Sequence, residues 1–437
     1  MIVIISDLHL TDGTSGQTIK TGAFQIFAER MREHARDASS RKNGVYKPVE
    51  CIDIILLGDI LDVLRSTTWN DLPPDIRPWG EISDKFVNQV RYVTERILEA
   101  NRDSLAVLKA LSRGVEIPAT ENPSGGVVTV PVKLRYLVGN HDWFYHLPRT
   151  DLDPVRNAII DAMGLANPRN TPFPHDPEEW EDLVASYKAH RVFARHGDIY
   201  DPDNYENGTR DGSSIGDAVV IELINRFTVL VNENHRLPNS CKKALREIDN
   251  VRPLSMIPAW VYGMTHKTCK DHGEVITEIW RQTAAAFLRV PFVKRHSMWL
   301  HPFRDVFSLA FGLLLSRVVP LSIISAVAIR KSAGRDHPSY GDTRSETWLT
   351  KGLAQFVVYG HTHREVIVPL RGTLGRKTVD QVYFNSGTWR PIHELAQFQR
   401  SRQQFVGYQV MTYIAFFQDD EFAGRGFDCW SGALDQE

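Results

Sequence analysis

The sequence has few cysteines and no excess of either charge, and each shortage excludes a class of protein. Only four cysteines occur in 437 residues, at Cys51, Cys241, Cys269 and Cys429, and none forms a CxxC pair. This spacing argues against a zinc ribbon and against a dense disulfide framework, and it favours a reducing compartment. The 51 basic residues are balanced by 53 acidic ones, so no whole-chain field attracts nucleic acid or lipid.

Targeting segments, repeats and low-complexity tracts are also missing. The opening run MIVIISDLHL is too short for the apolar core of a signal peptide and lacks a basic flank. We therefore expect a cytoplasmic protein. With 42% hydrophobic and 24% charged residues the composition is that of an ordinary globular protein, and the length allows two domains or one domain with an insertion.

The pattern of apolar residues predicts an α/β protein. Short β-branched runs occur at 2–5, 52–57, 134–138 and 192–194, and a long helical pattern covers 86–111. Strand patterns return after a gap, and they cover 355–359, 366–368, 381–384 and 406–417. The sequence thus predicts a discontinuous α/β domain made of residues 1–204 and 351–437.

The sequence predicts that residues 205–350 form a helical and basic insertion. Apolar side chains recur there at helical spacing, and 19 basic residues face 14 acidic ones, whereas the remainder of the chain has 32 against 39. The segment 281–335 contains nine basic residues and one acid, Asp305, interleaved with aromatics. Its apolar stretches are interrupted by Arg317 and Pro320, which argues against a membrane span.

Three interpretations of segment 281–335 stay open. Its helices could be buried in the insertion, with the basic side chains reaching water. A helix pair could instead dock on anionic lipid at the inner face of the membrane, because aromatic and basic residues flank its apolar stretches. The third interpretation is a groove for nucleic acid, which would require exposed aromatic side chains for stacking.

Five short polar motifs share one kind of position along the chain. Each follows a predicted strand directly: DLH at 7–9, GDILD at 58–62, GNHD at 139–142, HGD at 196–198 and GHTH at 360–363. In open α/β sheets, ligands bind outside the carboxyl ends of the strands, so these turns should converge on one crevice. Carboxylate, imidazole and carboxamide ligands without thiolate suit Mn, Fe, Zn or Co better than Ca or Mg. The number of ligands implies two divalent metal ions, for which we expect manganese.

These motifs, in this order, resemble those of the calcineurin-like metallophosphoesterase superfamily, and the resemblance covers residues 1–200 and 351–420. It implies a sandwich of two β-sheets flanked by helices, with residues 205–350 as a lid. It assigns Asp7, His9 and His363 to one ion, Asn140, His196 and His361 to the other, and Asp59 to a bridging position. The resemblance also implies roles for residues of the second and third motifs. His141 would be a proton donor, and Asp62 or Asp142 could orient an imidazole. Both aspartates could equally cap a helix or turn.

Other polar residues near the motifs have simpler explanations. Asp198 and Asp201 follow His196 and should shape a loop rather than bind metal. The run Asn385-Ser386-Gly387-Thr388 follows a strand on the same side as the motifs, and a plain turn is the favoured reading.

The sequence thus predicts a dinuclear phosphoesterase that hydrolyses a phosphodiester or pyrophosphate through metal-activated hydroxide. The motif order is also loosely similar to that of UDP-2,3-diacylglucosamine pyrophosphatases, which would make the substrate a lipid-linked nucleotide rather than another phosphorylated small molecule. This chain departs from them at GNHD, where those enzymes usually have GNRD, and in its longer insertion. A DNA or RNA phosphodiesterase and a metal-stabilised interaction scaffold are the alternatives.

Overall fold

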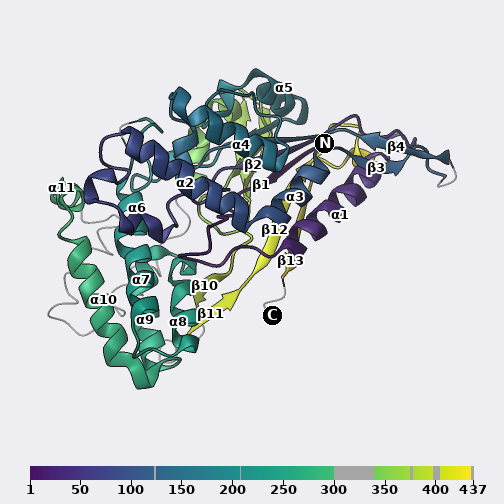
Figure 1. Cartoon of the computed structure of the whole chain (residues 1–437). Helices are drawn as coiled ribbons and strands as arrows, with labels where there is room; N and C mark the ends of the chain where they lie inside the picture. The colour runs from purple at the N-terminus through teal and green to yellow at the C-terminus, as the bar shows by residue number, and fades with distance from the viewer. Residues whose placement is uncertain (123–124, 207, 300–338, 375–376, 397–403, 435–437) are drawn as a thin grey trace.

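The computed structural model describes residues 1–122, 125–206, 208–299, 339–374, 377–396 and 404–434, and it shows an α/β protein with mixed sheets (Figure 1). The α/β fold class is confirmed. The larger sheet has the order β13-β12-β1-β2-β5, in which β1, β2 and β5 run parallel. The second sheet has the order β6-β7-β9-β8, in which β6, β7 and β9 run parallel. The strands of these sheets are β1 (Ile2–Ile5), β2 (Ile52–Leu57), β5 (Val132–Leu137), β6 (Val192–Ala194), β7 (Phe356–Tyr359), β8 (Val366–Leu374), β9 (Lys377–Asn385), β12 (Val410–Phe416) and β13 (Phe427–Ala433).

Alternate side chains of β1 enter two different apolar cores, which shows how the layers are stacked. Ile2 and Ile4 pack in a core with residues of the second sheet such as Val357 and Phe384. Val3 and Ile5 point the other way, into a core shared with the helices that cover the larger sheet. Because both faces of β1 are buried, the strand is a continuous β-branched run rather than an alternating pattern.

Helices cover the outer face of the larger sheet (Figure 1). They are α1 (Thr21–Ala38), α2 (Asp84–Ala100), α3 (Arg102–Leu111) and α4 (Asp153–Met163), while α5 (Glu181–His190) packs beside the second sheet. The single helical pattern predicted over 86–111 is two helices separated by Asn101. The Asn101 side chain donates to the carbonyls of Ile97 and Thr11 and so fixes the chain at this break.

Two small two-stranded sheets complete the strand inventory. β3 (Val115–Pro118) pairs with β4 (Val127–Val130), and β10 (Ile392–Leu395) pairs with β11 (Phe405–Tyr408). The second pair lies beside the helices drawn at the lower left of Figure 1, and its residues Leu395 and Phe405 pack against their core.

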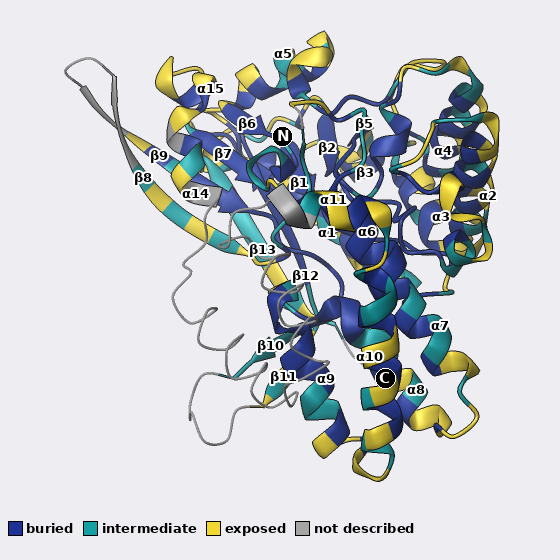
Figure 2. Cartoon of the chain, turned by 90° about the vertical axis from the view of Figure 1, so that its left-hand side faces the viewer, coloured by how far each residue is buried: buried dark blue, intermediate teal, exposed yellow. Residues whose placement is uncertain are grey.

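Residues 215–293 form a helical region with an apolar core of its own. Its elements are α6 (Ile215–Ala218), the π-helical turn η8 (Val219–Asn225), α7 (Arg226–Glu233), α8 (Asn239–Leu245), α9 (Ile257–His266), α10 (Gly273–Phe287) and α11 (Pro291–Trp299). Phe227, Trp260 and Trp280 lie at its centre, and the exposed faces of these helices alternate with buried ones in Figure 2. Two short helices, α14 (Ser339–Asp342) and α15 (Thr347–Thr350), precede β7.

Of segment 281–335, residues 300–335 lie outside the described residues, so the three interpretations of this segment stay predictions, as does the division into domains. Phe292, one of its described aromatics, is buried and stacks on Trp79 with ring centroids 5.3 Å apart. Among the described residues, no helix has the length and apolar character needed to cross a membrane.

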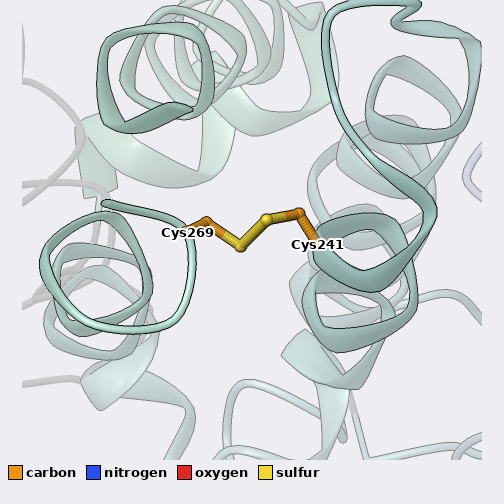
Figure 3. Close-up of a disulfide and its surroundings, with 2 residues drawn as sticks. All are labelled: Cys241 and Cys269. Atoms are coloured by element: carbon orange, nitrogen blue, oxygen red, sulfur yellow. A yellow bond between two sulfur atoms is a disulfide. The ribbon is translucent and has the colours of Figure 1, made fainter. Parts of the chain in front are cut away.

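A disulfide joins Cys241 of α8 to Cys269, which follows α9 (Figure 3). The two cysteines are separated by 28 positions in the chain, and their Cα atoms are 5.8 Å apart. Cys51 and Cys429 are free. The bond is at odds with the reducing compartment that the cysteine spacing suggested, and the sequence offered no local signal for it.

Candidate metal centre

The five predicted motifs lie together at the carboxyl ends of β1, β2, β5, β6 and β7. Their donor atoms fall into groups in which all members lie within 4.8 Å of one another. The groups are Asp7 with His9 and His363, Asp59 with His196 and His361, and His9 with Asp62 and His141. Residues separated by more than 350 positions therefore share one site, as strand order and direction require.

The first group has one carboxylate and two imidazoles. The Nε2 atoms of His9 and His363 are 2.9 Å apart, and Asp7 Oδ1 lies 3.8 Å and 3.4 Å from them, respectively. Asp7 and His9 are almost fully buried. Burial of such a donor set without a counter-charge is costly, and its chemistry suits a divalent transition ion. The residues present thus fit the ion that the sequence predicts.

The second group gathers around the amide oxygen of Asn140. This oxygen lies 3.1 Å from His196 Nε2 and 2.9 Å from His361 Nδ1. His196 is oriented by the carbonyl of Leu57, which is 2.9 Å from its Nδ1, so its Nε2 faces the group. A second cation has three donors of the same kinds available here.

Asp59 belongs to the second group and also approaches the first. Its Oδ2 lies 3.6 Å from His9 Nε2 and 3.3 Å from His196 Nε2, while its Oδ1 accepts a hydrogen bond from the backbone of His141. Burial alone would raise the pKa of Asp59, but the imidazoles of His196 and His141 outweigh it and hold this pKa below its ordinary value. The carboxylate is therefore charged, and its Oδ2 is near donors of both groups.

The backbone is strained at five of the predicted ligands. Asp7, His9, Asp59, His361 and His363 all have positive φ angles, between 43° and 67°. Non-glycine residues rarely adopt this left-handed conformation, and when they do so in a cluster the surrounding structure must hold them there. This cluster of strain coincides with the predicted ligands, which is the usual pattern of a functional site.

Two motif glycines allow the close approach of these turns. A Cβ atom on Gly139 would lie only 2.7 Å from His196 Nε2 and would also collide with Asp59. A Cβ atom on Gly360 would lie 2.8 Å from Ser6 Cβ and would collide with Ser6 Oγ and with Asp7. A side chain at either position would therefore displace a predicted ligand.

Asp62 orients two imidazoles at once. Its Oδ2 is 2.8 Å from His9 Nδ1 and its Oδ1 is 2.9 Å from His141 Nδ1. Burial opposes its ionisation, but the neighbouring His141 and His9 keep the pKa of Asp62 well below its ordinary value. A charged carboxylate at Nδ1 fixes each ring and directs its Nε2 outward. Asp62 has both of the roles left open for it, because its Oδ1 also accepts a hydrogen bond from the backbone N–H of Arg65 at 3.0 Å and so caps a turn.

Asp142 has the other predicted role, that of capping a turn. Its carboxylate accepts hydrogen bonds from the backbone of Gly139 and Ile60 and from the hydroxyl of Tyr136, and it contacts no imidazole. Burial and the charge of Asp59 raise its pKa to about 6. Asp142 therefore braces the GNHD and GDILD turns, which agrees with the capping role, and its placement among the catalytic residues stays a prediction.

The predicted turn at Asn385–Thr388 supports the site from behind. Asn385 donates to the carbonyl of Gly360, Ser386 Oγ lies 2.7 Å from Ser6 Oγ, and Thr388 donates to the carbonyl of Asp7. Asp198 also serves structure, because it is held by His175 and Arg210.

Two residues at the site escaped the sequence analysis. Asp201, expected only to shape a loop, accepts from His361, whose Nε2 lies 3.0 Å from its Oδ2, so Nδ1 of that ring faces Asn140. Arg252, from the helical region, places Nη2 2.7 Å from His363 Nδ1. Burial and the charge of Arg252 hold the pKa of His363 well below its ordinary value. The HxH motif gave no signal for either partner, because both come from distant segments.

Solvent reaches the site at a few side chains only. Asp7, His9, Asp59 and His196 are buried, whereas His141 and His361 are 13% and 14% exposed in their side chains. A substrate would therefore meet the site on the side of His141 and His361.

Comparison with models of protein families found no match for this chain, and neither did a search of curated proteins.

Proposed function

We propose that this chain is a metal-dependent phosphohydrolase of the calcineurin-like metallophosphoesterase type, acting on a phosphodiester or a pyrophosphate. The observation that carries the proposal is the position of Asp59, whose one carboxylate oxygen lies between His9 and His196 of two separate donor groups. Two cations bound there would activate a water molecule and neutralise charge on the phosphoryl oxygens. The order of the motifs along the chain supports the same assignment.

His141 supplies the proton in this proposal. Its Nδ1 is occupied by Asp62, so its Nε2 is free to donate to the leaving oxygen, on the side of the site that solvent reaches. The contact with Asp62 keeps the ring of His141 in this orientation. Asp201 and the carbonyl of Leu57 orient His361 and His196 in the same manner.

The test is hydrolysis of a generic phosphodiester, bis(p-nitrophenyl) phosphate, by the full chain with added Mn²⁺. Asp59→Ala removes the bridging position and should lower kcat/KM by about 10³-fold or more, with loss of bound metal in elemental analysis. His141→Ala should lower kcat by about 10²-fold or more while bound metal stays, because His141 is assigned as a proton donor.

Matched controls are Asp161→Ala and His235→Ala, which change exposed side chains outside the site and should leave turnover intact. Loss of metal in His141→Ala would reassign His141 as a ligand, as its grouping with His9 and Asp62 would allow. Metal binding without turnover of any phosphate ester would favour the interaction scaffold, and absence of metal binding would refute the proposal.

A further inference from the structure

Three arginines from separate parts of the chain meet beside the metal centre. Arg65 follows the GDILD turn, Arg390 follows β9, and Arg252 belongs to the helical region. A Cβ atom on Gly16 would lie 2.6 Å from Arg65 Nη2 and 3.1 Å from Arg390 Nη2, so these guanidinium groups lie next to each other. Arg252 connects them to the centre through its contact with His363.

The acids around this cluster do not balance it. Asp249 contacts Arg65 directly and lies 3.7 Å from Arg390 Nη1. Among the described residues it is the one carboxylate within ion-pair distance of the three arginines. Glu247 lies farther away, near His393, and Asp62 is engaged by His9 and His141. Three positive charges thus face one close carboxylate, and cations at the metal centre would add to that excess.

Arg390 carries donors that nothing in the described chain satisfies. The side chain is 3% exposed, yet its Nε and Nη1 have no hydrogen-bond partner among the described residues. Burial of an unsatisfied charged donor costs several kcal/mol in general, so such a group calls for a ligand. Burial, followed by repulsion from Arg390, lowers the pKa of Arg65 to about 9 and that of Arg252 to about 10.

Arg252 is held in place so that one end of its guanidinium faces the site. Its Nη1 donates to the backbone carbonyls of Val251 and Asp249, and its Nη2 is directed at His363. No carboxylate of the described residues lies within ion-pair distance of it. Arg65, by contrast, donates from Nε and Nη2 to Ser15 and pairs with Asp249 through Nη1, and it serves to position its neighbours.

We propose that Arg252 and Arg390 form a subsite for a second phosphoryl group of the substrate, next to the group held at the metal centre. The planar guanidinium offers paired N–H donors that match phosphate oxygens, which a lysine cannot do. The inference rests on the proposed function for the placement of the scissile group. It narrows the substrate class from any phosphodiester to compounds with two phosphoryl groups.

The test compares two non-hydrolysable probes with inorganic phosphate, by calorimetric titration of the full chain with Mn²⁺ and again after chelation. Methylenediphosphonate has adjacent phosphorus atoms, and propylenediphosphonate has them three carbons apart. We expect at least one diphosphonate to bind wild type about tenfold or more tightly than phosphate, equivalent to about 1.4 kcal/mol. Arg390→Gln and Arg252→Gln should each bring this ratio close to one, and Arg390→Lys should restore part of it.

Arg113→Gln, which removes an exposed arginine elsewhere, is the matched control and should keep the ratio. Arg252 is only partly buried, so Arg252→Gln reports on the subsite even if Arg390→Gln fails to fold. A ratio near one in wild type, or a ratio unchanged in Arg252→Gln, would overturn the subsite. If the protein binds no metal, the proposed function fails, but the titrations after chelation still test the subsite. Tighter binding of a diphosphonate than of phosphate, lost in the arginine variants, would then support the subsite.

Discussion

The helical region and its boundary with the α/β part differ in the side chains that they bury. Inside the helical region the core is apolar and aromatic, and it includes Phe227, Trp260 and Trp280. At the boundary, buried hydrogen bonds accompany the apolar contacts: Glu222 accepts from Arg77, and Asp217 accepts from Trp143.

The π-helical turn η8 contributes to this polar boundary. Asn225, at its end, donates to the carbonyls of Leu64 and Ser66 and accepts from Ser15. Apolar contact is tolerant of sliding, whereas directional hydrogen bonds between buried groups fix one arrangement. The comparison teaches that the apolar core stabilises the helical region, while the polar boundary sets its position, and with it that of Arg252, relative to the metal centre.

Trp280→Ala tests the apolar half of the comparison and should have the largest effect on stability. Trp280 is fully buried in the core of the helical region, so its truncation should lower the free energy of unfolding by about 3–5 kcal/mol. Denaturant unfolding followed by circular dichroism measures the loss. Trp280 is not one of the residues grouped at the metal centre, so the metal content of the folded variant should equal that of wild type. A parallel loss of metal would contradict the view that the apolar core stabilises the helical region without positioning the metal centre.

Asp217→Asn tests the polar half of the comparison through the pH dependence of stability. Burial raises the pKa of Asp217 to about 6, above its ordinary value of 3.8, so the folded protein holds this proton more tightly than the unfolded chain. The stability that it contributes is therefore present below about pH 4 and is lost as pH rises to about 6, a change of about 3 kcal/mol.

In Asp217→Asn that component of the pH dependence should disappear. Unfolding midpoints of wild type and variant at pH 4, 5, 6 and 7 show whether the difference between them grows in favour of the variant as pH rises. A constant difference across this range would mean that Asp217 does not titrate at the boundary.

Asp62→Asn tests the metal centre, and it should have the smallest effect of the three substitutions. The amide keeps the shape but loses the charge that holds His9 and His141, so kcat should fall by about 10- to 100-fold. Steady-state hydrolysis of the same phosphodiester measures the change. An unchanged kcat would contradict the role of Asp62 in orienting the two rings.

The sheets and the convergence of the motifs could be predicted from local patterns. β1, β2 and β6 begin and end at the predicted residues, because a strand buried on both faces is a continuous apolar run with clear ends. The motifs were predictable for the same reason, since each follows a buried strand of this kind, namely β1, β2, β5, β6 or β7.

What the sequence concealed depends on contacts between distant segments. Arg252 and Arg390 are single arginines without a local pattern, and only the fold brings them to one place. Cys241 and Cys269 are likewise ordinary in sequence. The contacts of Asp142 could not be chosen from the sequence either, because a carboxylate in such a motif looks the same whether it faces an imidazole or a backbone amide.

The left-handed backbone at Asp7, His9, Asp59, His361 and His363 limits how this protein can change over evolution. Valine, isoleucine and threonine are poorly tolerated in that conformation, whereas glycine adopts it freely. Replacement of any of these five by glycine should relieve the backbone and remove a donor in one step. Descendants with such a glycine would be more stable than their ancestor and would lack the proposed activity.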